Sequence, residues 1–485
     1  MTCEVKLYRK RQVLGKIETG CAEPEILAAI DGGIEVSVSP QAEPEVQMNE
    51  RDVARISLTN LLAVPGEVSG SLKFTHEFKG SGTNAKDPAI LKYLEGCSMV
   101  KTDLKRIKIG AITPSGSGVT LKYGAVMSVS ADAAKAGIVV IPYDPETSSY
   151  VYYERTGTGF ASGDVITFTN PGTGAGTVDA TSSAVEEDHG KTATFTSSNQ
   201  KTMTLRSEED GYKKEIYSAM GNFSVAADAS GFAVFEMDYS GVVSKGYVAD
   251  ASITVDIAAG KKIVGASGAE AVLIRGVDGD PTPTVNEEIH YVYIGATKFT
   301  PGEALVDSQA VSVGVFNGTY ENRGGFGDQD NTLNVVFDET TPPILQDAQL
   351  VIKDADGIDP DFKPVFSNVS LESGNEVILR KDGNSINGLR TARIPSRKPT
   401  ISVDPEMMSE ASFDIFNRWF DGSPASLGFK VGKGGDFNSM YIYTKKAQFT
   451  GCSDGDRDGV CVVTAEAMLA GDYSGTDDEL KIVFY

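Results

Sequence analysis

Cysteine is scarce in this sequence, and its scarcity excludes one class of fold. The 485 residues include five cysteines. An odd and sparse set argues against the disulfide framework that stabilises small secreted domains, so buried free thiols are expected. Cys452 and Cys461 flank an apparent hairpin turn and could face each other, although a reducing cytoplasm disfavours a bond between them. The cysteines are Cys3, Cys21, Cys97, Cys452 and Cys461.

Histidine is rarer still, and its copies lie far apart. His76 falls in an alternating strand pattern, which predicts a packed or edge residue, and His189 follows acidic residues in a predicted loop. Neither they nor His290 has a Cys or His neighbour at metal-ligand spacing, and no Ser-His-Asp arrangement is supported. The Gly-rich segments lack the context of a dinucleotide loop, and no Gly-Lys-Ser/Thr occurs. The sequence therefore predicts no enzyme, no catalytic residue and no cofactor.

Long hydrophobic runs are also missing. No apolar stretch approaches the roughly 18 residues that a helix needs to cross a bilayer. The segment from Met1 to Lys16 is basic but lacks the apolar core of a secretory signal. We therefore expect no membrane association, and synthesis and folding in a cytoplasm.

Positive charge is in deficit, with a formal net charge of −23 and a pI near 4.6. Conventional nucleic-acid binding is excluded, because such proteins neutralise phosphates with clustered Lys and Arg. An acidic surface usually maintains solubility. A wall that DNA must slide past without adhering would need the same sign of charge.

Glycine and short alternating runs are abundant, and they predict a mainly β protein. The 52 glycines supply turns between strands. Apolar residues recur at every second position in several segments, as in a strand with one buried face. Three such runs are Leu72, Phe74, His76 and Phe78; Phe223, Val225 and Ala227; and Leu480, Ile482 and Phe484.

Two short helices are predicted, each opened by Asp-Pro and closed by Gly. They run from Asp87-Pro88 to Gly96 and from Asp404-Pro405 to Gly422. Asp accepts hydrogen bonds from free amides at a helix start, Pro fits the first turn, and Gly tolerates the left-handed end. A stripe on the second helix should pack on a sheet: Met408, Ala411, Ile415 and Trp419.

The strand-like flanks of both helices correspond, which suggests a duplicated unit of sheet and helix. A second repeat places paired tyrosines before a Phe-x-x-Gly-acidic turn, at Phe160 to Asp164 and at Phe299 to Glu303. It indicates two small inserted β modules, unless the turn is simply a common hairpin. The tyrosines are Tyr152, Tyr153, Tyr291 and Tyr293. The expected division is a first unit at 1–124 and 201–242, insertions at 125–200 and 243–320, and a second unit at 321–485.

One segment resembles the start of a metal-binding loop. Asp454, Asp456 and Asp458, followed by Gly459, match the opening of a calcium loop, in which alternating carboxylates converge on the ion. The twelfth position is Ala465 where a bidentate Glu is needed. The segment therefore predicts an acidic hairpin loop, with calcium as a weak alternative and no other metal site.

A family resemblance adds to this reading. The opening Leu7 to Glu18, the segment Phe78 to Cys97 and the segment Ala219 to Gly241 resemble, in order, parts of major tail tube proteins from long non-contractile phage and prophage tails. The C-terminal half is similar to the family at Val369 to Arg380, Arg393 to Pro405 and Asp477 to Tyr485. The two insertions depart from the simplest members.

The resemblance implies two β-sandwich or barrel units, each with a short helix, in a structural protein of the virion that is assembled in the host cytoplasm. Such subunits close rings that stack into a tube for DNA, so that with two units per chain, three copies would complete a ring. The implied partners are further copies, tail tip and terminator proteins, a tape measure protein in the lumen, and passing double-stranded DNA. The insertions would project outward.

Two other functions remain open. The same fold and ring closure would serve the inner tube of a contractile tail or an injection apparatus. The repeated tyrosines could instead form stacking surfaces of a carbohydrate-binding adhesin module.

Overall fold

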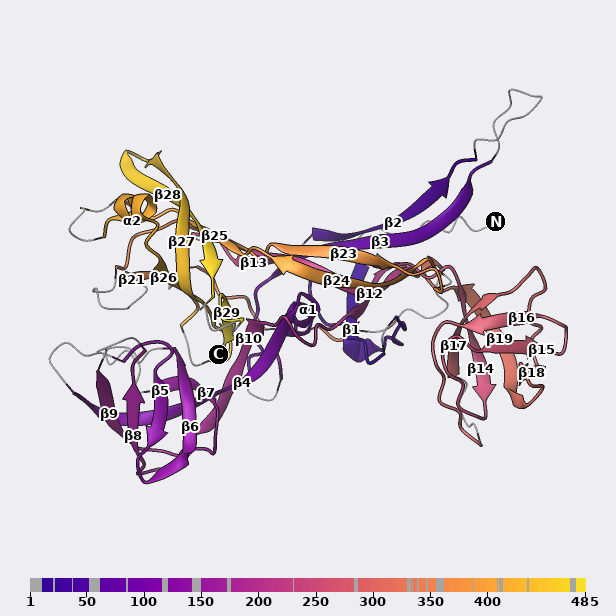
Figure 1. Ribbon diagram of the computed structural model, residues 1–485, viewed down its shortest axis with the longest axis horizontal. Helices are drawn as coiled ribbons and strands as arrows, with labels where there is room; N and C mark the ends of the chain where they lie inside the picture. The colour runs from indigo at the N-terminus through magenta and orange to yellow at the C-terminus, as the bar shows by residue number, and fades with distance from the viewer. Residues whose placement is uncertain are drawn as a thin grey trace.

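The computed structural model is mainly β, with 58% of the chain in strands and 4% in helices, as the sequence predicts (Figure 1). It describes residues 11–20, 22–36, 38–51, 62–83, 86–115, 121–141, 150–171, 176–229, 231–282, 287–328, 333, 335–337, 340–345, 348–354, 362–385, 387–407, 409, 413–433, 436–471 and 477–485. Within these residues no helix is long and apolar enough to span a membrane.

One sandwich-like unit, the N-terminal unit, joins segments from the first half of the chain. Its main sheet has the order β2-β3-β13-β12, and the first part of β12 bends away to pair with β11, which pairs with β1. Its elements are β1 (Arg11–Ile17), η1 (Ala29–Asp31), β2 (Val38–Asn49), β3 (Val64–Glu77), α1 (Leu91–Gly96), β11 (Met203–Glu209), β12 (Tyr212–Asp228) and β13 (Ala233–Val242).

A second unit, the C-terminal unit, repeats this arrangement strand for strand. Its main sheet has the order β22-β25-β28-β27, and the first part of β27 pairs with β26, which pairs with β21. Its elements are β21 (Gln349–Asp354), β22 (Asn368–Glu372), β25 (Thr400–Val403), α2 (Ile415–Asp421), β26 (Ala425–Val431), β27 (Met440–Arg457) and β28 (Val460–Ala470). A hairpin of β23 (Asn375–Lys381) and β24 (Leu389–Arg397) extends the β22–β25 pair, as the long β2–β3 hairpin does in the other unit.

A shared irregularity supports true correspondence between the units. The pairing of β11 with β12 shifts register between Met203 and Leu205, and that of β26 with β27 shifts between Ala425 and Leu427. A bulge at the same point of the same strand is a specific feature of a fold. The predicted duplication therefore has a topological counterpart.

The two units are joined edge to edge within the chain. β12 pairs with β22, so that one antiparallel sheet continues from β2 to β27. The buried alternating residues of both units form a single hydrophobic core, which includes the predicted strand positions Leu72, Phe223 and Ile482. The internal joint is therefore as closely packed as the units themselves.

The first inserted module is a closed ring of strands. β4 pairs with both β7 and β9, and the ring continues through β6, β5 and β8. We call it the first barrel. Its strands are β4 (Met99–Pro114), β5 (Val126–Val129), β6 (Asp132–Ile141), β7 (Tyr150–Arg155), β8 (Val165–Thr169) and β9 (Thr177–Ser182).

The second barrel has the same topology. Its strands follow the order β14-β17-β16-β15-β18-β19. When the strands of each barrel are numbered along the chain, this is the same order as β4-β7-β6-β5-β8-β9 in the first barrel. The repeated turn is equivalent in both, because Gly163 and Gly302 adopt φ of 88° and 83°. Its strands are β14 (Tyr247–Ile253), β15 (Lys262–Gly265), β16 (Glu270–Leu273), β17 (Glu287–Tyr293), β18 (Glu303–Asp307) and β19 (Ser312–Arg323).

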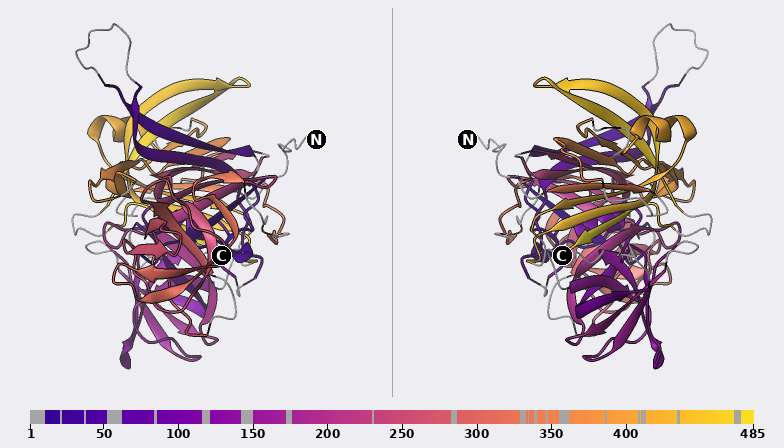
Figure 2. Two further views of the ribbon diagram at one scale, coloured as in Figure 1. Left: turned by 90° about the vertical axis from the view of Figure 1, so that its right-hand side faces the viewer. Right: turned by 90° about the vertical axis from the view of Figure 1, so that its left-hand side faces the viewer.

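Three further strands connect the barrels to the units: β10 (Glu187–Phe195), β20 (Phe326–Asp328) and β29 (Lys481–Phe484). β29 lies between β10 and β27, and β20 pairs with the first part of β12. Both barrels lie on the same side of the joined sheet (Figures 1 and 2).

Both helices start later than predicted. α1 begins at Leu91, and the Asp87 carboxylate pairs with Lys101 at 3.0 Å instead of capping the helix. α2 begins at Ile415, with Asp414 as the cap that accepts from the Asn417 amide. Its end is as predicted, with Gly422 left-handed at φ 65°.

The residue expected to open the second helix has another role. Asp404 accepts hydrogen bonds from the backbone amides of Ser367 and Asn368. In the predicted stripe, Ile415 is buried and Trp419 packs on the core. Met408 and Ala411 lie outside the described residues.

Candidate assembly interface

Two unpaired strand edges lie at opposite ends of the joined sheet, and they make the candidate site (Figure 1). Of the described strands, only β3 pairs with β2. Beyond Ala447, β27 pairs with β28 on one side and with no described strand on the other. Exposed edges of this length promote association unless they are covered.

The internal joint shows what each edge can accept. Leu371 of β22 lies opposite Val225 of β12, and both side chains are buried. The Ser373 amide donates to the Phe223 carbonyl at 2.9 Å. β22 occupies the same place in its unit as β2, and β12 the same place as β27. The free edges therefore form a complementary pair.

Beyond the joint, the β23–β24 hairpin packs over the N-terminal unit. Leu389 contacts Tyr217 and Val242, and Ile394 contacts Met220. The Asn387 amide donates to the Tyr217 hydroxyl at 2.6 Å. This hairpin therefore covers apolar side chains of a neighbouring unit.

The corresponding β2–β3 hairpin has apolar residues without such cover. Their exposed fractions are 44% for Val46, 55% for Met48 and 49% for Val64, and Leu62 at the same end is 89% exposed. Adjacent apolar side chains on a protruding hairpin mark a surface that is buried in an assembly. Alternation in the sequence gave no signal for these residues, because they look like ordinary strand positions.

On the open face of the paired strands of the joined sheet, carboxylates outnumber basic residues. Side chains alternate across a strand, so the residues between the core positions share this face. Exposed carboxylates of this face are Glu43, Glu45, Asp228, Glu236, Glu372 and Glu466. The basic residues of the same strands and face are Lys73, Lys446 and Arg457, of which Lys73 pairs with Asp238 at 2.7 Å and Arg457 with Asp404 at 3.1 Å. The β23–β24 hairpin packs on this face over Met220 and Val242, and it adds exposed cations at Arg380, Lys381, Arg390 and Arg393.

The second barrel docks on the N-terminal unit through charged groups. Arg206 of β11 pairs with Glu215 of β12 at 2.6 Å, and all but a few per cent of both side chains is buried. Glu288 of β17 interacts electrostatically with Arg206 and Lys213. Burial raises the pKa of Glu288, but its hydrogen bond to His290 and the nearby cations outweigh burial and lower that pKa to about 2.

The first barrel docks on the C-terminal unit through aromatic groups. Tyr123 stacks on Tyr443 with ring centroids 3.5 Å apart, and Tyr152 contacts Tyr485 edge-on at 5.2 Å. By the shared register of the bulge, Tyr443 corresponds to Glu215 of the other unit. The two barrels therefore attach at equivalent strands by different chemistry.

The repeated tyrosines pack within or against the two barrels. Tyr153 and Tyr291 are fully buried inside the two barrels, and Tyr152 is 7% exposed. Each barrel also holds a carboxylate against its tyrosines: Glu186 accepts from the Tyr153 hydroxyl, and Glu321 from that of Tyr293 at 2.6 Å. Tyr152, Tyr153 and Tyr291 therefore offer no open ring face that a sugar could stack on, and the half-buried Tyr293 packs against Tyr247, Tyr291 and Phe299.

The histidines lie in different surroundings. His76 is buried in β3, and its Nδ1 lies 2.7 Å from the Glu35 carbonyl. His189 is in β10, not in the predicted loop, and packs between Tyr152 and Phe437. Burial lowers the pKa of His189 to about 4. The acidic residues before His189 predict a loop, but its aromatic contacts come from residues distant in sequence and hold it in a strand.

The candidate calcium segment lies in the β27–β28 hairpin. Asp454 is opposite Val463 within the strand pair, and the Asp456 carboxylate accepts from the Gly459 amide at 2.8 Å, with Asp458 in the turn. Among the described residues, no three acidic, His or Cys side chains converge as a metal site.

Cys452 and Cys461 are not bonded to each other in this hairpin, and Cys461 is exposed where the sequence predicts a buried thiol. Register places Cys452 opposite Ala465 and Cys461 opposite Asp456, and both thiols are free. The hairpin turn lies closer to Cys461 than a symmetric reading of the sequence assumes.

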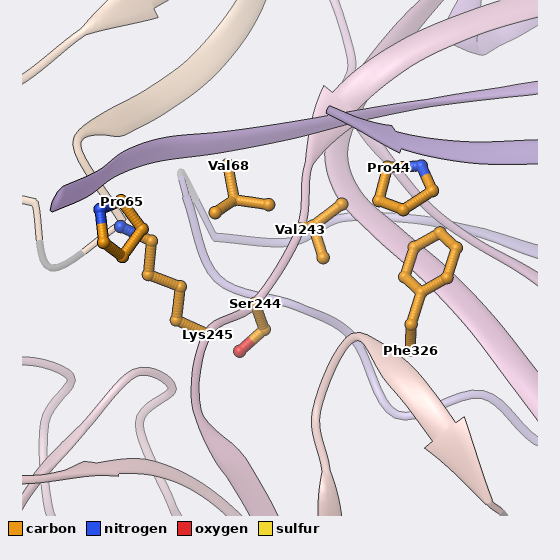
Figure 3. A pocket seen from close by; sticks show the side chains of 7 residues that line it. All are labelled: Pro44, Pro65, Val68, Val243, Ser244, Lys245 and Phe326. Carbon is orange, nitrogen blue, oxygen red and sulfur yellow. The ribbon is translucent and has the colours of Figure 1, made fainter. Parts of the chain in front are cut away.

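A shallow apolar groove lies at the base of the β2–β3 hairpin (Figure 3). Its apolar lining includes Val68, Val243, Pro44 and Phe326, of which Pro44 and Phe326 lie next to each other. Lys245 is the one ionisable group of the lining, and its ammonium donates to the Gly66 carbonyl. The lining therefore offers packing surface and no set of acid, base and nucleophile.

No protein-family model matches the chain, and no curated protein matches it.

Proposed function

We propose that this chain is the major subunit of a phage tail tube, a structural virion protein that polymerises as stacked rings and conducts DNA. The observation that carries the proposal is the internal joint. Two units of the same topology are joined edge to edge. The outer strands of the joined sheet are β2 and β27, and their free edges correspond to the two sides of that joint.

A repeated joint of this kind closes a ring. A head-to-tail contact generates a closed ring when its rotation closes, and here the rotation between the two units of one chain sets the rotation between chains. Three copies would contribute six units and join their sheets into one continuous wall. Every strand edge of the joined sheet would then be paired, which removes the risk of uncontrolled association.

The charge distribution fits a conduit. In such a ring the open face, with its strand carboxylates and the basic β23–β24 hairpin on part of it, would line the lumen, and the barrels, which dock behind the core, would lie outside. DNA carries about one negative charge per 1.7 Å of axis. A wall of the same sign would let DNA pass without being held, and a tape measure protein would occupy the lumen before it. Tail tip and terminator proteins would cover the two ends of the stack.

Mass and image data on the purified protein test this proposal. Electron microscopy should show hollow rings or tubes, and the mass of one ring should equal three chains. Six chains per ring would refute the use of both units in one wall while leaving the tube assignment standing. A protein that stays monomeric at all concentrations would refute the tube assignment. A sheath around isolated tubes would instead identify the inner tube of a contractile particle.

A further inference from the structure

The correspondence between the units extends to single residues. Ala42 of β2 lies opposite Leu72 of β3, and Leu371 of β22 lies opposite Ile401 of β25. Leu72 and Ile401 occupy the same place in their units, because they pair with Tyr239 of β13 and Ala467 of β28. Ala42 therefore corresponds to Leu371. The same argument relates Val225 of β12 to Asp454 of β27. Since Leu371 lies opposite Val225 at the internal joint, Ala42 and Asp454 are the matching positions of the free edges.

We propose that β2 of one copy pairs antiparallel with β27 of a second copy, with Ala42 opposite Asp454 and Pro44 opposite Cys452. The proposal rests on the proposed function and adds to it the register of the contact between chains. We call this contact the interchain joint. Counting along both strands places Glu43 opposite Ser453, and it brings Asp456 to the register shift of β2 around Pro40.

Charge at the two edges supports this register. The Arg11 guanidinium donates to the Pro40 carbonyl at 3.3 Å and also pairs with Glu209 at 3.6 Å, so a cation that is shared with β11 lies beside that end of β2. Asp454 and Asp456 are exposed on the edge of β27. The register brings these carboxylates of one chain toward Arg11 of the next. Opposite charges across an interface set its register and suppress wrong pairings.

The interchain joint differs from the internal joint in a definite way. Ser373 donates its amide to Phe223 at the internal joint, but its counterpart Pro44 has no amide hydrogen. Asn375, which donates to the carbonyls of Cys97 and Gly221, has the apolar counterpart Val46. The interchain joint therefore has fewer hydrogen bonds and relies more on the exposed apolar residues of the β2–β3 hairpin.

Paired cysteines test the register. In a background with Cys452→Ser and Cys461→Ser, Glu43→Cys is combined with Ser453→Cys, and the matched control combines Glu45→Cys with Ser453→Cys. Directly opposite Cβ atoms lie about 4.5–5.5 Å apart and diagonal ones about 7–8 Å. A disulfide needs about 3.5–4.5 Å, so only the first pair is close enough to bond with a small adjustment. Oxidised assemblies are run on a denaturing gel without reductant.

Covalent dimers and trimers from the first pair, and monomers from the control, are the expected result. If microscopy shows normal tubes but the control pair bonds, or neither pair bonds, the register is wrong and the tube assignment stands. If the cysteine-depleted background makes no assembly although the unsubstituted chain does, each pair is tested instead in the unsubstituted chain. If neither assembles, the proposed function and the register fail together.

A charge substitution gives an independent readout. Asp456→Lys should slow assembly about tenfold, the equivalent of one lost charge contact. Asp458→Lys is the control of equal charge change, because Asp458 lies in the hairpin turn with φ 52° and outside the proposed strand pairing. Equal slowing by both variants would contradict a specific contact at Asp456.

Discussion

Glu18 places a carboxylate among hydroxyl groups where β12 leaves the main sheet. Its oxygens accept from the Thr202 hydroxyl and the Ser218 amide, each at 2.6 Å. Ser218 has a φ of 49°, so the carboxylate holds a strained turn of the bulge. Burial raises the pKa of Glu18 to about 7, although the hydrogen bonds oppose that shift.

Glu18→Gln should therefore remove a pH dependence of stability. With a folded pKa of about 7 against an ordinary pKa of 4.5, the protonated carboxyl favours the folded state fully below about pH 4.5. That contribution is lost as pH rises through 7, and the whole shift corresponds to about 3 kcal/mol. We expect the variant to gain stability relative to the parent at pH 8 and not at pH 4.5.

Chemical denaturation of the unassembled chain at the two pH values measures this difference. Glutamine keeps an acceptor for the Ser218 amide and can donate to a hydroxyl, whereas Glu18→Ala leaves both without a partner. Alanine should be destabilising at both pH values. A glutamine variant that loses as much stability at pH 8 as alanine would show that the carboxylate is needed in its charged form.

Among the elements, the β2–β3 hairpin is predicted to act in assembly and not in folding. Val46→Ser with Met48→Ser should change the free energy of unfolding by no more than about 0.5 kcal/mol, because both side chains are exposed in the single chain. Ring formation should fall sharply, since the same side chains would be buried between chains. Sedimentation and denaturation curves of the variant give the two quantities.

Two controls frame that experiment. Val315→Ser changes an exposed valine of the second barrel, 38% exposed, and should leave ring formation unchanged. Ile394→Ser changes a buried residue of the β23–β24 hairpin, which corresponds to the β2–β3 hairpin. This variant should destabilise the single chain by a few kcal/mol. Normal rings from the Val46 and Met48 variant would exclude the hairpin from the interface.

The second barrel should be dispensable for tube formation. Its entry and exit lie side by side, because the Gly324 amide donates to the Gly246 carbonyl at 3.0 Å. Removing residues 247–323 and joining Gly246 to Gly324 therefore keeps the path of the remaining chain. Arg206 keeps its partner Glu215, and Lys213, which loses Glu288, keeps Glu215 and Glu208 nearby.

The deletion variant should form hollow tubes of reduced outer diameter and unchanged lumen. Image averages of parent and variant tubes make the comparison. A variant that folds, as judged by a cooperative unfolding transition, but forms no rings would show that the second barrel contributes to the interface between chains.

At the same scale, local patterns predicted strands and turns better than helix starts. Alternation identified Leu72 to Phe78 because one face of β3 is buried against a continuous core. The repeated Phe-x-x-Gly-acidic turn was recognisable because its geometry is local: Asp164 and Glu303 each accept from the amide three residues before them.

Long-range contacts explain what the sequence could not predict. Asp404 resembles a helix cap but is held by Ser367 and Asn368, which are distant in sequence. The edges of β2 and β27 could not be recognised, since an edge is defined by the absence of a neighbour in the fold. The equivalent attachment of the two barrels could not be predicted either, because Glu215 and Tyr443 share a position but no chemistry.

For the whole molecule, the proposed ring carries one barrel on every unit. The second barrel sits on the N-terminal unit and the first barrel on the C-terminal unit, at strands that correspond through the shared bulge. Three chains would then present six barrels of one topology around the tube. The two kinds differ in attachment, since one depends on buried charges and the other on stacked tyrosines. Extreme pH would therefore loosen the second barrel first, whereas salt would have little effect on charges that are buried.

In the proposed assembly, the open face of the joined sheet lines the lumen through which DNA passes. Repulsion between like charges falls off over about 8 Å at physiological salt, so only carboxylates on the wall itself can keep DNA from adhering. Glu236→Lys with Glu466→Lys reverses two exposed carboxylates of the open face on opposite sides of the internal joint. Tubes should still assemble, because neither side chain faces the core or a free edge.

These variant tubes should retain duplex DNA at physiological salt and release it as salt is raised, and phage that carry them should eject their genome more slowly. Asp132→Lys with Asp179→Lys makes the same change of charge on exposed positions of the first barrel, outside the proposed lumen. Retention of a short labelled duplex by filtration, at several salt concentrations, compares the two variants with the parent. The lumen variant should bind and the barrel variant should not, because the duplex must be surrounded by the altered charge to be held. Equal retention by both variants would mean that net charge, and not its place on the open face, decides the interaction with DNA.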